Sequence, residues 1–243
     1  MRNKPTQQEQ NTTKGPKKTN VGQSKKWRPR ASLLLREMVS KLHSDSKWIN
    51  VSDGGHVENL GAFELLRRRC EIVIVGEGES DANGAFPGLS TLMRLAEIDL
   101  GVKIEFPEGA LKKLILPADF AQLKGDELDK AIAAQRHFSV ARIRYPKKGD
   151  QPKEFGFFLY VRSSLRGNED QVIKSYQEEN PAFPHESTAD QMFNEGQFEA
   201  YRRLGVKMMS EALTDISAGT LTDDKTPYSN LRSNLETWWD SGE

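Results

Sequence analysis

The stretch that organises the chain runs from Trp48 to Asp81 and reads WINVSDGGHVENLGAFELLRRRCEIVIVGEGESD. It opens with an alternating apolar run that ends at the turn-forming residues 52–55, continues through a helix-like segment, and closes with the apolar residues 71–75. A strand, a glycine turn, a helix and a second strand in this order predict a βαβ unit, and hence parallel strands. Because ligands of α/β sheets bind beyond the carboxyl ends of strands, we expect Asp53 to lie where chemistry takes place.

The rest of the chain extends this pattern. Residues 86–100 carry apolar side chains at helical spacing, and residues 102–106 alternate as a third strand, which gives the order βαβαβ. Two alternating runs, Phe138 to Tyr145 and Phe155 to Val161, predict an antiparallel hairpin. We therefore expect an α/β fold with a largely parallel central sheet, flanking helices and one antiparallel hairpin. Apolar spacing predicts further helices over residues 32–43, 59–69, 127–135, 170–179 and 190–212.

Composition divides the chain into three parts. Residues 1–30 hold nine Lys or Arg, one acid and almost no apolar residue, which predicts a disordered basic arm. Residues 31–217 are expected to form the folded domain, and residues 218–243 a polar, mobile tail apart from a cluster of Leu235, Trp238 and Trp239. Since the whole chain has 35 basic and 35 acidic residues, the part that follows the arm is acidic.

Cysteine usage and hydropathy favour a cytoplasmic protein. Cys70 is the single cysteine, so an internal disulfide is excluded and a reducing compartment suits the chain. No apolar run approaches the ~20 residues that cross a bilayer. The basic arm leaves peripheral contact with an anionic membrane open, although a solvated tail is the simpler interpretation. Nucleic acid is not an expected partner, because no aromatic or motif spacing accompanies the charge.

The residues around Asp53 resemble a known family. Residues 52–61 (SDGGHVENLG), followed by residues 64–70 (ELLRRRC) and an apolar strand, resemble the Asp-Gly-Gly segment of patatin-like phospholipases. The resemblance is closest to bacterial members that are similar to the catalytic domain of cytosolic phospholipase A2. Residues 137–146, 183–193 and 197–202 resemble the same group. The resemblance covers residues 31–210 and corresponds to the C-terminal portion of the family's domain.

This resemblance implies a lipid acyl hydrolase that works through a Ser-Asp dyad. The serine of a Gly-x-Ser-x-Gly turn attacks the ester, an aspartate takes its proton, and a glycine-rich loop supplies oxyanion-hole N–H groups. By resemblance, Asp53 is the catalytic base, and Gly54 and Gly55 shape the substrate-binding turn. The implied substrate is a glycerophospholipid or another acyl ester, cleaved through an acyl-serine intermediate with neither a metal nor another cofactor.

The nucleophile of that dyad is missing from the sequence. The closest match, Gly88-Leu89-Ser90-Thr91-Leu92, has leucine where the motif has its last glycine. In the family the nucleophile precedes the Asp-Gly-Gly segment, but most of the residues before Asp53 belong to the basic arm. We therefore expect a chain that is inactive alone and supplies half of an active site, completed by a separate N-terminal half. A catalytically silent binding or scaffold domain, or Ser90 as a non-standard nucleophile, are the alternatives.

Three histidines have structural interpretations. His56 adjoins the Asp53 turn and could titrate near neutrality, but a Ser-Asp dyad gives it no catalytic role, so a structural or orienting role is favoured. His137 and His185 belong to no recognisable metal motif.

Three acids cluster after the second strand, where carboxylate oxygens could hold Ca²⁺ or Mg²⁺. They are Glu77, Glu79 and Asp81. Their spacing matches no complete metal-binding loop, so solvated loop acids are the favoured interpretation and no metal is expected.

Overall fold

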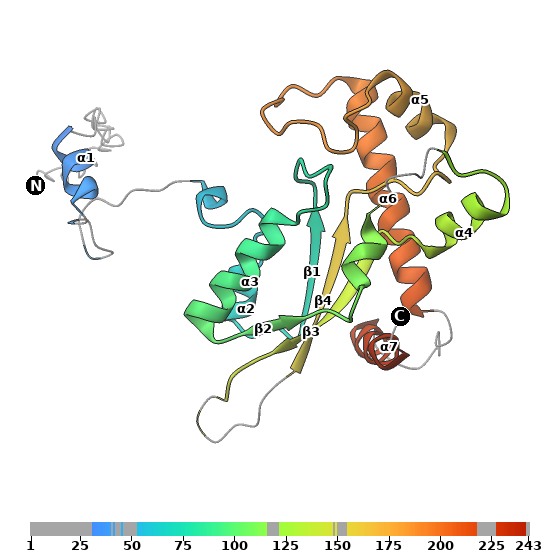
Figure 1. Cartoon of the computed structure of the whole chain (residues 1–243). Helices are drawn as coiled ribbons and strands as arrows, with labels where there is room; N and C mark the ends of the chain where they lie inside the picture. Colours follow the sequence, from blue (N-terminus) through green and yellow to red (C-terminus); the bar gives the residue numbers. More distant parts are fainter. Residues whose placement is uncertain are drawn as a thin grey trace, which may run out of the picture. The chain divides into compact units, whose positions relative to one another are not determined.

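The computed structural model describes residues 31–39, 41, 45, 53–115, 122–147, 149, 155–217 and 227–241. The chain divides into two compact units, Met1–Ser52 and Asp53–Glu243. The first unit contains helix α1 (Ala31–Met38), which overlaps the helix predicted over residues 32–43. The basic arm and the strand predicted at residues 48–51 lie outside the described residues. All other elements belong to the second unit (Figure 1).

The second unit is built on a four-stranded mixed sheet with the order β1-β4-β3-β2. Its strands are β1 (Ile72–Glu77), β2 (Lys103–Glu105), β3 (Phe138–Arg144) and β4 (Phe155–Arg162). Strand β1 runs parallel to β4, with Ile74 opposite Leu159. Strand β3 is antiparallel to both β4 and β2, and Val140 also lies opposite Leu159. The predicted hairpin of β3 and β4 is therefore confirmed.

The prediction of a largely parallel sheet is wrong for the described strands, because β1 and β4 form their one parallel pair. Strands β1 and β2 follow each other along the chain, yet β4 and β3 lie between them. Strand β4 is buried from Gly156 to Arg162, which suits a central position, whereas the three-residue strand β2 begins with an exposed Lys103 and suits an edge. The alternation of apolar residues along the sequence identifies a strand, but it does not show which other strands pair with it in the sheet.

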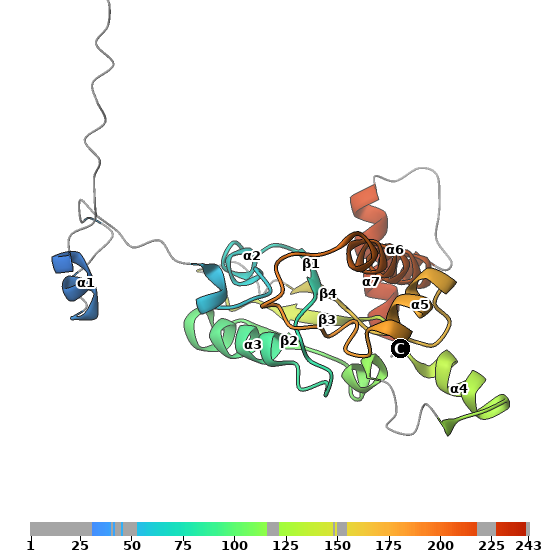
Figure 2. The same cartoon turned by 90° about the horizontal axis from the view of Figure 1, so that it is seen from above.

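Helices cover both faces of the sheet (Figures 1 and 2). One core joins the sheet to α2 (Phe63–Arg67), α3 (Pro87–Leu100) and the 3₁₀ helix η2 (Ala110–Leu114). The other core joins it to α5 (Gln171–Glu179), α6 (Glu195–Ser217) and α7 (Pro227–Ser241). Successive side chains of β4 point to opposite faces of the sheet, so Phe158 packs in the first core and Leu159 in the second. Helix α4 (Asp126–Ala134) precedes β3.

Helices α3 and α6 show why the sequence folds in this way. Helix α3 has proline in its first turn and ends at Gly101, whose φ of 65° lies in the left-handed region that favours glycine. Helix α6 buries residues at a spacing of four, which packs one apolar stripe on the sheet: Ala200, Leu204, Met208, Ala212 and Ile216. Each fully buried leucine contributes about 1.5–3 kcal/mol to folding. None of the helices in the described ranges has both the length and the apolar character to cross a membrane.

Helix α7 lies where the sequence predicts a polar tail. Its Leu235 is fully buried, and the ring of Trp238 packs 5.2 Å from that of Phe138, centroid to centroid. The guanidinium of Arg142 lies 5.0 Å from the centre of the Trp239 ring. The predicted cluster of three apolar residues is therefore the part of α7 that docks on strand β3, and residues 227–241 are not a tail.

Candidate functional site

Asp53 is held at a turn, with its carboxylate exposed. Its Oδ1 accepts a hydrogen bond of 2.9 Å from the backbone N–H of Gly55, so Asp53 caps the short 3₁₀ helix η1 (Gly54–His56). Among the described residues, no ion pair and no other side-chain hydrogen bond engages this carboxylate. A carboxylate that is oriented by the backbone but open to solvent suits proton transfer to an incoming group.

The two predicted glycines have different steric roles. A Cβ on Gly55 would lie 2.7 Å from Oδ1 of Asn59 and 3.4 Å from Oδ1 of Asp53, so only glycine fits there without a shift of the neighbours. A Cβ on Gly54 would meet no described atom within 4 Å. Gly55 is therefore the member of the pair that the turn requires.

Two residues that sequence reasoning used only for the resemblance fix this turn to the fold. Asn59 donates a 2.6 Å hydrogen bond from Nδ2 to Oε1 of Glu79, in the loop after β1. Glu58 accepts hydrogen bonds from the N–H groups of Leu60 (2.8 Å) and Phe63 (3.1 Å), so it caps the start of α2. The Asp53 turn is thus connected to the carboxyl end of β1 through Asn59.

A pocket of about 610 Å³ lies at that carboxyl end. Its lining includes Asn59, the segment 76–80, Pro87 and Thr188. The position agrees with the rule that ligands of α/β sheets bind beyond the ends of strands. Asp53 is not part of the lining, but Gly55, whose N–H binds its carboxylate, lies next to the side chain of Asn59 on the pocket wall.

Glu77 is the most deeply buried acid of this pocket, with 4% of the residue exposed. Its Oε2 accepts a hydrogen bond from the Tyr160 hydroxyl and lies 3.5 Å from Nε of Arg162. Its Oε1 is buried and has no hydrogen-bond partner in the described structure, which typically costs about 1–3 kcal/mol. Burial raises the pKa of Glu77, and this effect outweighs the opposing influence of Tyr160 and Arg162.

Asp81 is bound to the backbone that precedes α3. Its oxygens accept hydrogen bonds of 2.9 Å from the N–H groups of Ala85 and Phe86, and its Oδ2 lies 3.2 Å from Nη2 of Arg162. Burial alone would raise the pKa of Asp81, but these hydrogen bonds and the nearby guanidinium lower it.

The predicted solvated loop acids are therefore bound residues. Glu79 accepts from Asn59 at one oxygen and from the N–H of Gly88, at 2.9 Å, at the other, so Glu79 and Asp81 both receive N–H groups at the start of α3. The interpretation of these three acids as solvated is wrong, because their carboxylates bind the free N–H groups at the start of α3 and the guanidinium of Arg162. The described residues contain no group of three or more His, Cys, Asp or Glu side chains placed to hold a metal.

The histidines lie close to the backbone of the same region. Nδ1 of the exposed His56 is 3.1 Å from the carbonyl oxygen of Asp53, in the position of an orienting residue. Nδ1 of His185 lies 3.5 Å from the carbonyl oxygen of Glu79, and the Ser80 hydroxyl donates to the carbonyl of His185 at 2.7 Å. Burial lowers the pKa of His185. Two regions of the family resemblance, 52–61 and 183–193, therefore lie beside one pocket.

Ser90 does not have the geometry of a nucleophile turn. It is an exposed residue of helix α3, and its N–H donates to the carbonyl of Phe86 at 2.9 Å, as in a helical turn. A serine elbow places its hydroxyl on a sharp turn between a strand and a helix. The described structure brings no serine hydroxyl into hydrogen-bond contact with Asp53.

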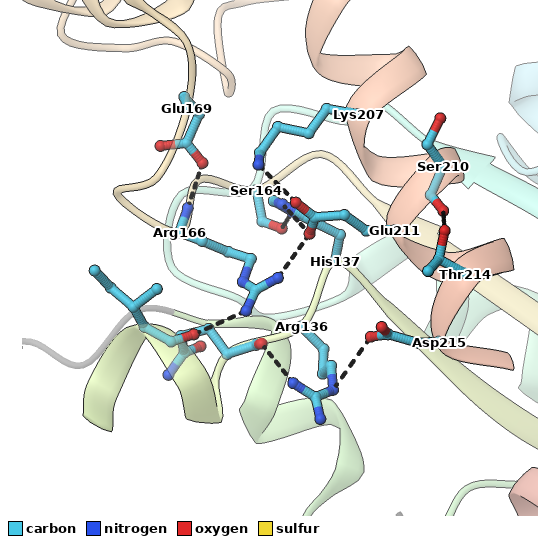
Figure 3. A network of polar contacts seen from close by, with 12 residues as sticks. Arg136, His137, Ser164, Arg166, Glu169, Lys207, Ser210, Glu211, Thr214 and Asp215 are labelled. Atoms are coloured by element: carbon cyan, nitrogen blue, oxygen red, sulfur yellow. Dashed lines mark hydrogen bonds and ion pairs between the residues drawn. The ribbon is translucent and has the colours of Figure 1, made fainter. Parts of the chain in front are cut away.

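A second polar cluster lies between β3, β4 and α6 (Figure 3). Nδ1 of His137 is 2.9 Å from Oγ of Ser164, and its Nε2 is 3.5 Å from Oε2 of Glu211. Glu211 is also paired with Arg166 and Lys207, each at 2.6 Å. The Ser-His-Glu order resembles that of a hydrolase triad, but Ser164 and His137 are 6% and 1% exposed, so a substrate cannot reach the hydroxyl. This cluster holds α6 on the sheet.

A second pocket, of about 600 Å³, lies near the beginning of β1 and β4. Three guanidinium groups line it, and they belong to Arg69, Arg142 and Arg232. Glu71 and Glu236 add two carboxylates, and Arg232 is paired with Glu71. The guanidinium of Arg142 also lies over the ring of Phe155. Such a mixture of arginine and aromatic side chains suits an anionic ligand with an apolar portion.

A scan against protein-family models found no match, and searches of curated proteins and of solved structures found none either.

Proposed function

We propose that this chain is the C-terminal part of a patatin-like lipid acyl hydrolase and that Asp53 is its general base. The observation that carries the proposal is the exposed carboxylate of Asp53, which Gly55 orients on the turn that precedes Asn59, a lining residue of the pocket at the carboxyl end of β1. The resemblance of residues 52–61 and 183–193 to that family supports the proposal, because both segments adjoin the pocket.

In the proposed reaction Asp53 moves one proton. A serine hydroxyl of the completing N-terminal half attacks the ester carbonyl, and Asp53 takes the hydroxyl proton as the acyl-serine bond forms. Asp53 then gives this proton to the alcohol that leaves. In the second half-reaction water attacks the acyl-serine while Asp53 takes a proton from it. Asp53 then returns this proton to the serine oxygen, and the carboxylic acid is released. The Gly55 N–H bond keeps one carboxylate oxygen fixed, so the other oxygen can face the serine.

Reconstitution tests this proposal. The purified chain, mixed with the polypeptide encoded immediately upstream of Met1, should hydrolyse a chromogenic short-chain ester, and Asp53→Asn should lower kcat by about 10²–10⁴-fold. Asp99→Asn is the matched control, because Asp99 is an exposed residue of α3. Turnover that survives Asp53→Asn would show that Asp53 is not the base.

A serine-directed probe separates this proposal from the Ser90 alternative. A fluorophosphonate should label the N-terminal half and leave the isolated chain unlabelled. Labelling of the isolated chain that Ser90→Ala removes would instead identify Ser90 as the nucleophile, since Ser90 is exposed on α3.

Non-catalytic binding of an anionic lipid headgroup is a second candidate function, which the pocket of Arg69, Arg142 and Arg232 favours. The wild-type chain should then sediment with vesicles of phosphatidylglycerol, and a smaller fraction of the Arg142→Gln variant should do so. Lys103→Gln is a control, because Lys103 lies exposed on β2 outside that pocket. If removal of residues 1–30 alone abolishes sedimentation, the basic arm binds the membrane and the pocket does not.

A further inference from the structure

The arginine pocket is the cavity of about 600 Å³ near the beginning of β1 and β4, whose lining includes Arg69, Arg142 and Arg232. Nη1 of Arg69 donates to the carbonyl of Pro146 at 3.0 Å, and Arg232 is paired with Glu71. Among the described residues, by contrast, no group accepts a hydrogen bond from the guanidinium of Arg142. The pocket therefore offers one guanidinium whose hydrogen bonds a ligand can complete.

Aromatic rings hold this guanidinium in place. The central carbon of the Arg142 guanidinium lies 5.6 Å from the centre of the Phe155 ring and 5.0 Å from that of the Trp239 ring. Its ionic partner in the described structure is Asp240, whose Oδ1 lies 3.7 Å from Nη2 and whose side chain is 69% exposed. An ion pair so long and so exposed contributes little. Nε is buried, whereas the side chain as a whole is 25% exposed, so a ligand can reach the outer edge that carries Nη1 and Nη2.

The charges of the lining limit which anion suits the pocket. Its three arginines and two glutamates leave a single net positive charge. A phosphate monoester carries about 1.5–2 negative charges at neutral pH, and Glu71 and Glu236 would oppose the additional charge. A carboxylate carries one charge and has two oxygens in one plane. The edge of one guanidinium can bind both oxygens at once.

Phe155 gives the pocket an apolar side. It is 42% exposed, whereas Tyr145 and Phe157 of the same lining are buried. Because the Phe155 ring lies beside the guanidinium of Arg142, an anion bound there would place an attached alkyl chain against this ring. Each methylene that the ring covers is removed from water, which favours binding of a chain over binding of a bare anion.

We propose that the arginine pocket binds a carboxylate with an alkyl chain, its two oxygens on Nη1 and Nη2 of Arg142 and its chain beside Phe155. A fatty acid has this chemistry, and the proposed ester hydrolysis releases one. The description of the ligand as a reaction product rests on the proposed function, whereas the binding depends only on the pocket. Since the pocket near Asn59 lies at the other end of β1, the acid would bind without occupying it.

Titration calorimetry with sodium octanoate and the full chain tests the contact with Arg142. Arg142→Gln should bind octanoate at least about tenfold more weakly, because two charge-assisted hydrogen bonds are lost. Glu236→Gln should bind it more tightly, because a like charge leaves the lining. Arg202→Gln is the matched control and should bind as wild type does, since Arg202 is exposed on α6 outside this pocket.

The chain and the head group are tested with further ligands. Butyrate should bind at least about tenfold more weakly than octanoate, because it covers fewer methylenes. Octyl phosphate and dihexanoyl phosphatidylglycerol should also bind more weakly than octanoate. Tighter binding of either would overturn the assignment to a carboxylate, and tighter binding of the phosphatidylglycerol would favour the lipid headgroup instead.

Two results would overturn the proposal outright. They are the absence of octanoate binding by the wild-type chain and an affinity of Arg142→Gln equal to that of wild type. If Arg142→Gln fails to fold, as judged by circular dichroism, Arg142→Lys takes its place. Lysine keeps the charge but not the planar pair of donors, so this variant should still bind more weakly than wild type, and equal binding would refute the bidentate contact.

Asp53→Asn separates this inference from the proposed function. The variant should bind octanoate as wild type does, because Asp53 does not line the arginine pocket. If octanoate binding depends on Arg142 but no reconstituted turnover depends on Asp53, the proposed function fails and the carboxylate site remains. If turnover depends on Asp53 but octanoate does not bind, only the inference about the arginine pocket fails.

Discussion

Acidification should destabilise this fold through His137 before most carboxylates are protonated. The His137 side chain is fully buried, with Nδ1 2.9 Å from the Ser164 hydroxyl and Nε2 3.5 Å from Glu211. Burial lowers the pKa of His137 to about 4 even though Glu211 favours the charged form, and Arg166 and Lys207 lower it further. The folded protein therefore keeps this imidazole neutral at physiological pH.

The size and the pH window of the effect follow from this pKa. In the unfolded chain a histidine has a pKa of about 6.5, so the unfolded state binds a proton as the pH falls below that value, while the folded state does not until about pH 4. The difference corresponds to about 3 kcal/mol. The free energy of unfolding should thus fall by up to about 1.4 kcal/mol per pH unit between those values.

Urea denaturation of wild type and His137→Asn, at a series of pH values from about 7.5 to about 4, measures this effect. Asparagine can replace the bond from Nδ1 to Ser164 but does not titrate. The stability of the variant should decline less across the window, and His56→Asn, at an exposed histidine, should behave as wild type. Parallel curves for wild type and His137→Asn would refute the reasoning, because the groups that remain, including Glu211, are common to both proteins.

Three further substitutions test other parts of the structure. Arg162→Met leaves Glu77 and Asp81 without their shared guanidinium, so it should lower the free energy of unfolding in urea by about 3–5 kcal/mol; a change below about 1 kcal/mol would contradict the pairing. Gly55→Ala should cost roughly 1–3 kcal/mol by the same assay, whereas Gly54→Ala should be neutral or slightly stabilising, and equal effects would argue against the contact with Asn59. Leu235→Ala should cost about 2–5 kcal/mol, and an unchanged urea midpoint would show that α7 is not docked.

Local pattern predicted the elements of this fold better than their arrangement. The hairpin, helix α3 and the Gly101 stop follow from spacing and from a single residue, and the structure has all of them. The position of β4 between β1 and β3 depends instead on pairing across a long separation, as in Ile72 opposite Phe157. Helix α7 was missed because only Leu235 and two tryptophans stand out in a polar segment.

The site shows the same division. Asp53 is held by a turn with Gly55, which the Asp-Gly-Gly pattern predicts without knowledge of the fold. Arg162 ends an apolar strand and suggests solvent exposure, but its partner Asp81 lies 81 residues earlier. The roles of Glu77 and Glu79 likewise depend on Tyr160 and Asn59, which only the folded chain brings to them. No local signal could have identified these contacts.

The position of β1 at the end of the described sheet has a consequence for assembly. The carbonyls of Glu71 and Glu77 accept from β4, so by the alternation of a parallel pair residues 72, 74 and 76 direct their backbone groups away from it. Ile74 is 44% exposed on this strand, which carries neither lysine nor proline to discourage pairing. A parallel strand that joined this edge would bring its own carboxyl end to the rim of the pocket that Asn59 and Glu77 line, so the backbone bonds that lengthened the sheet would also add a new side chain to that pocket.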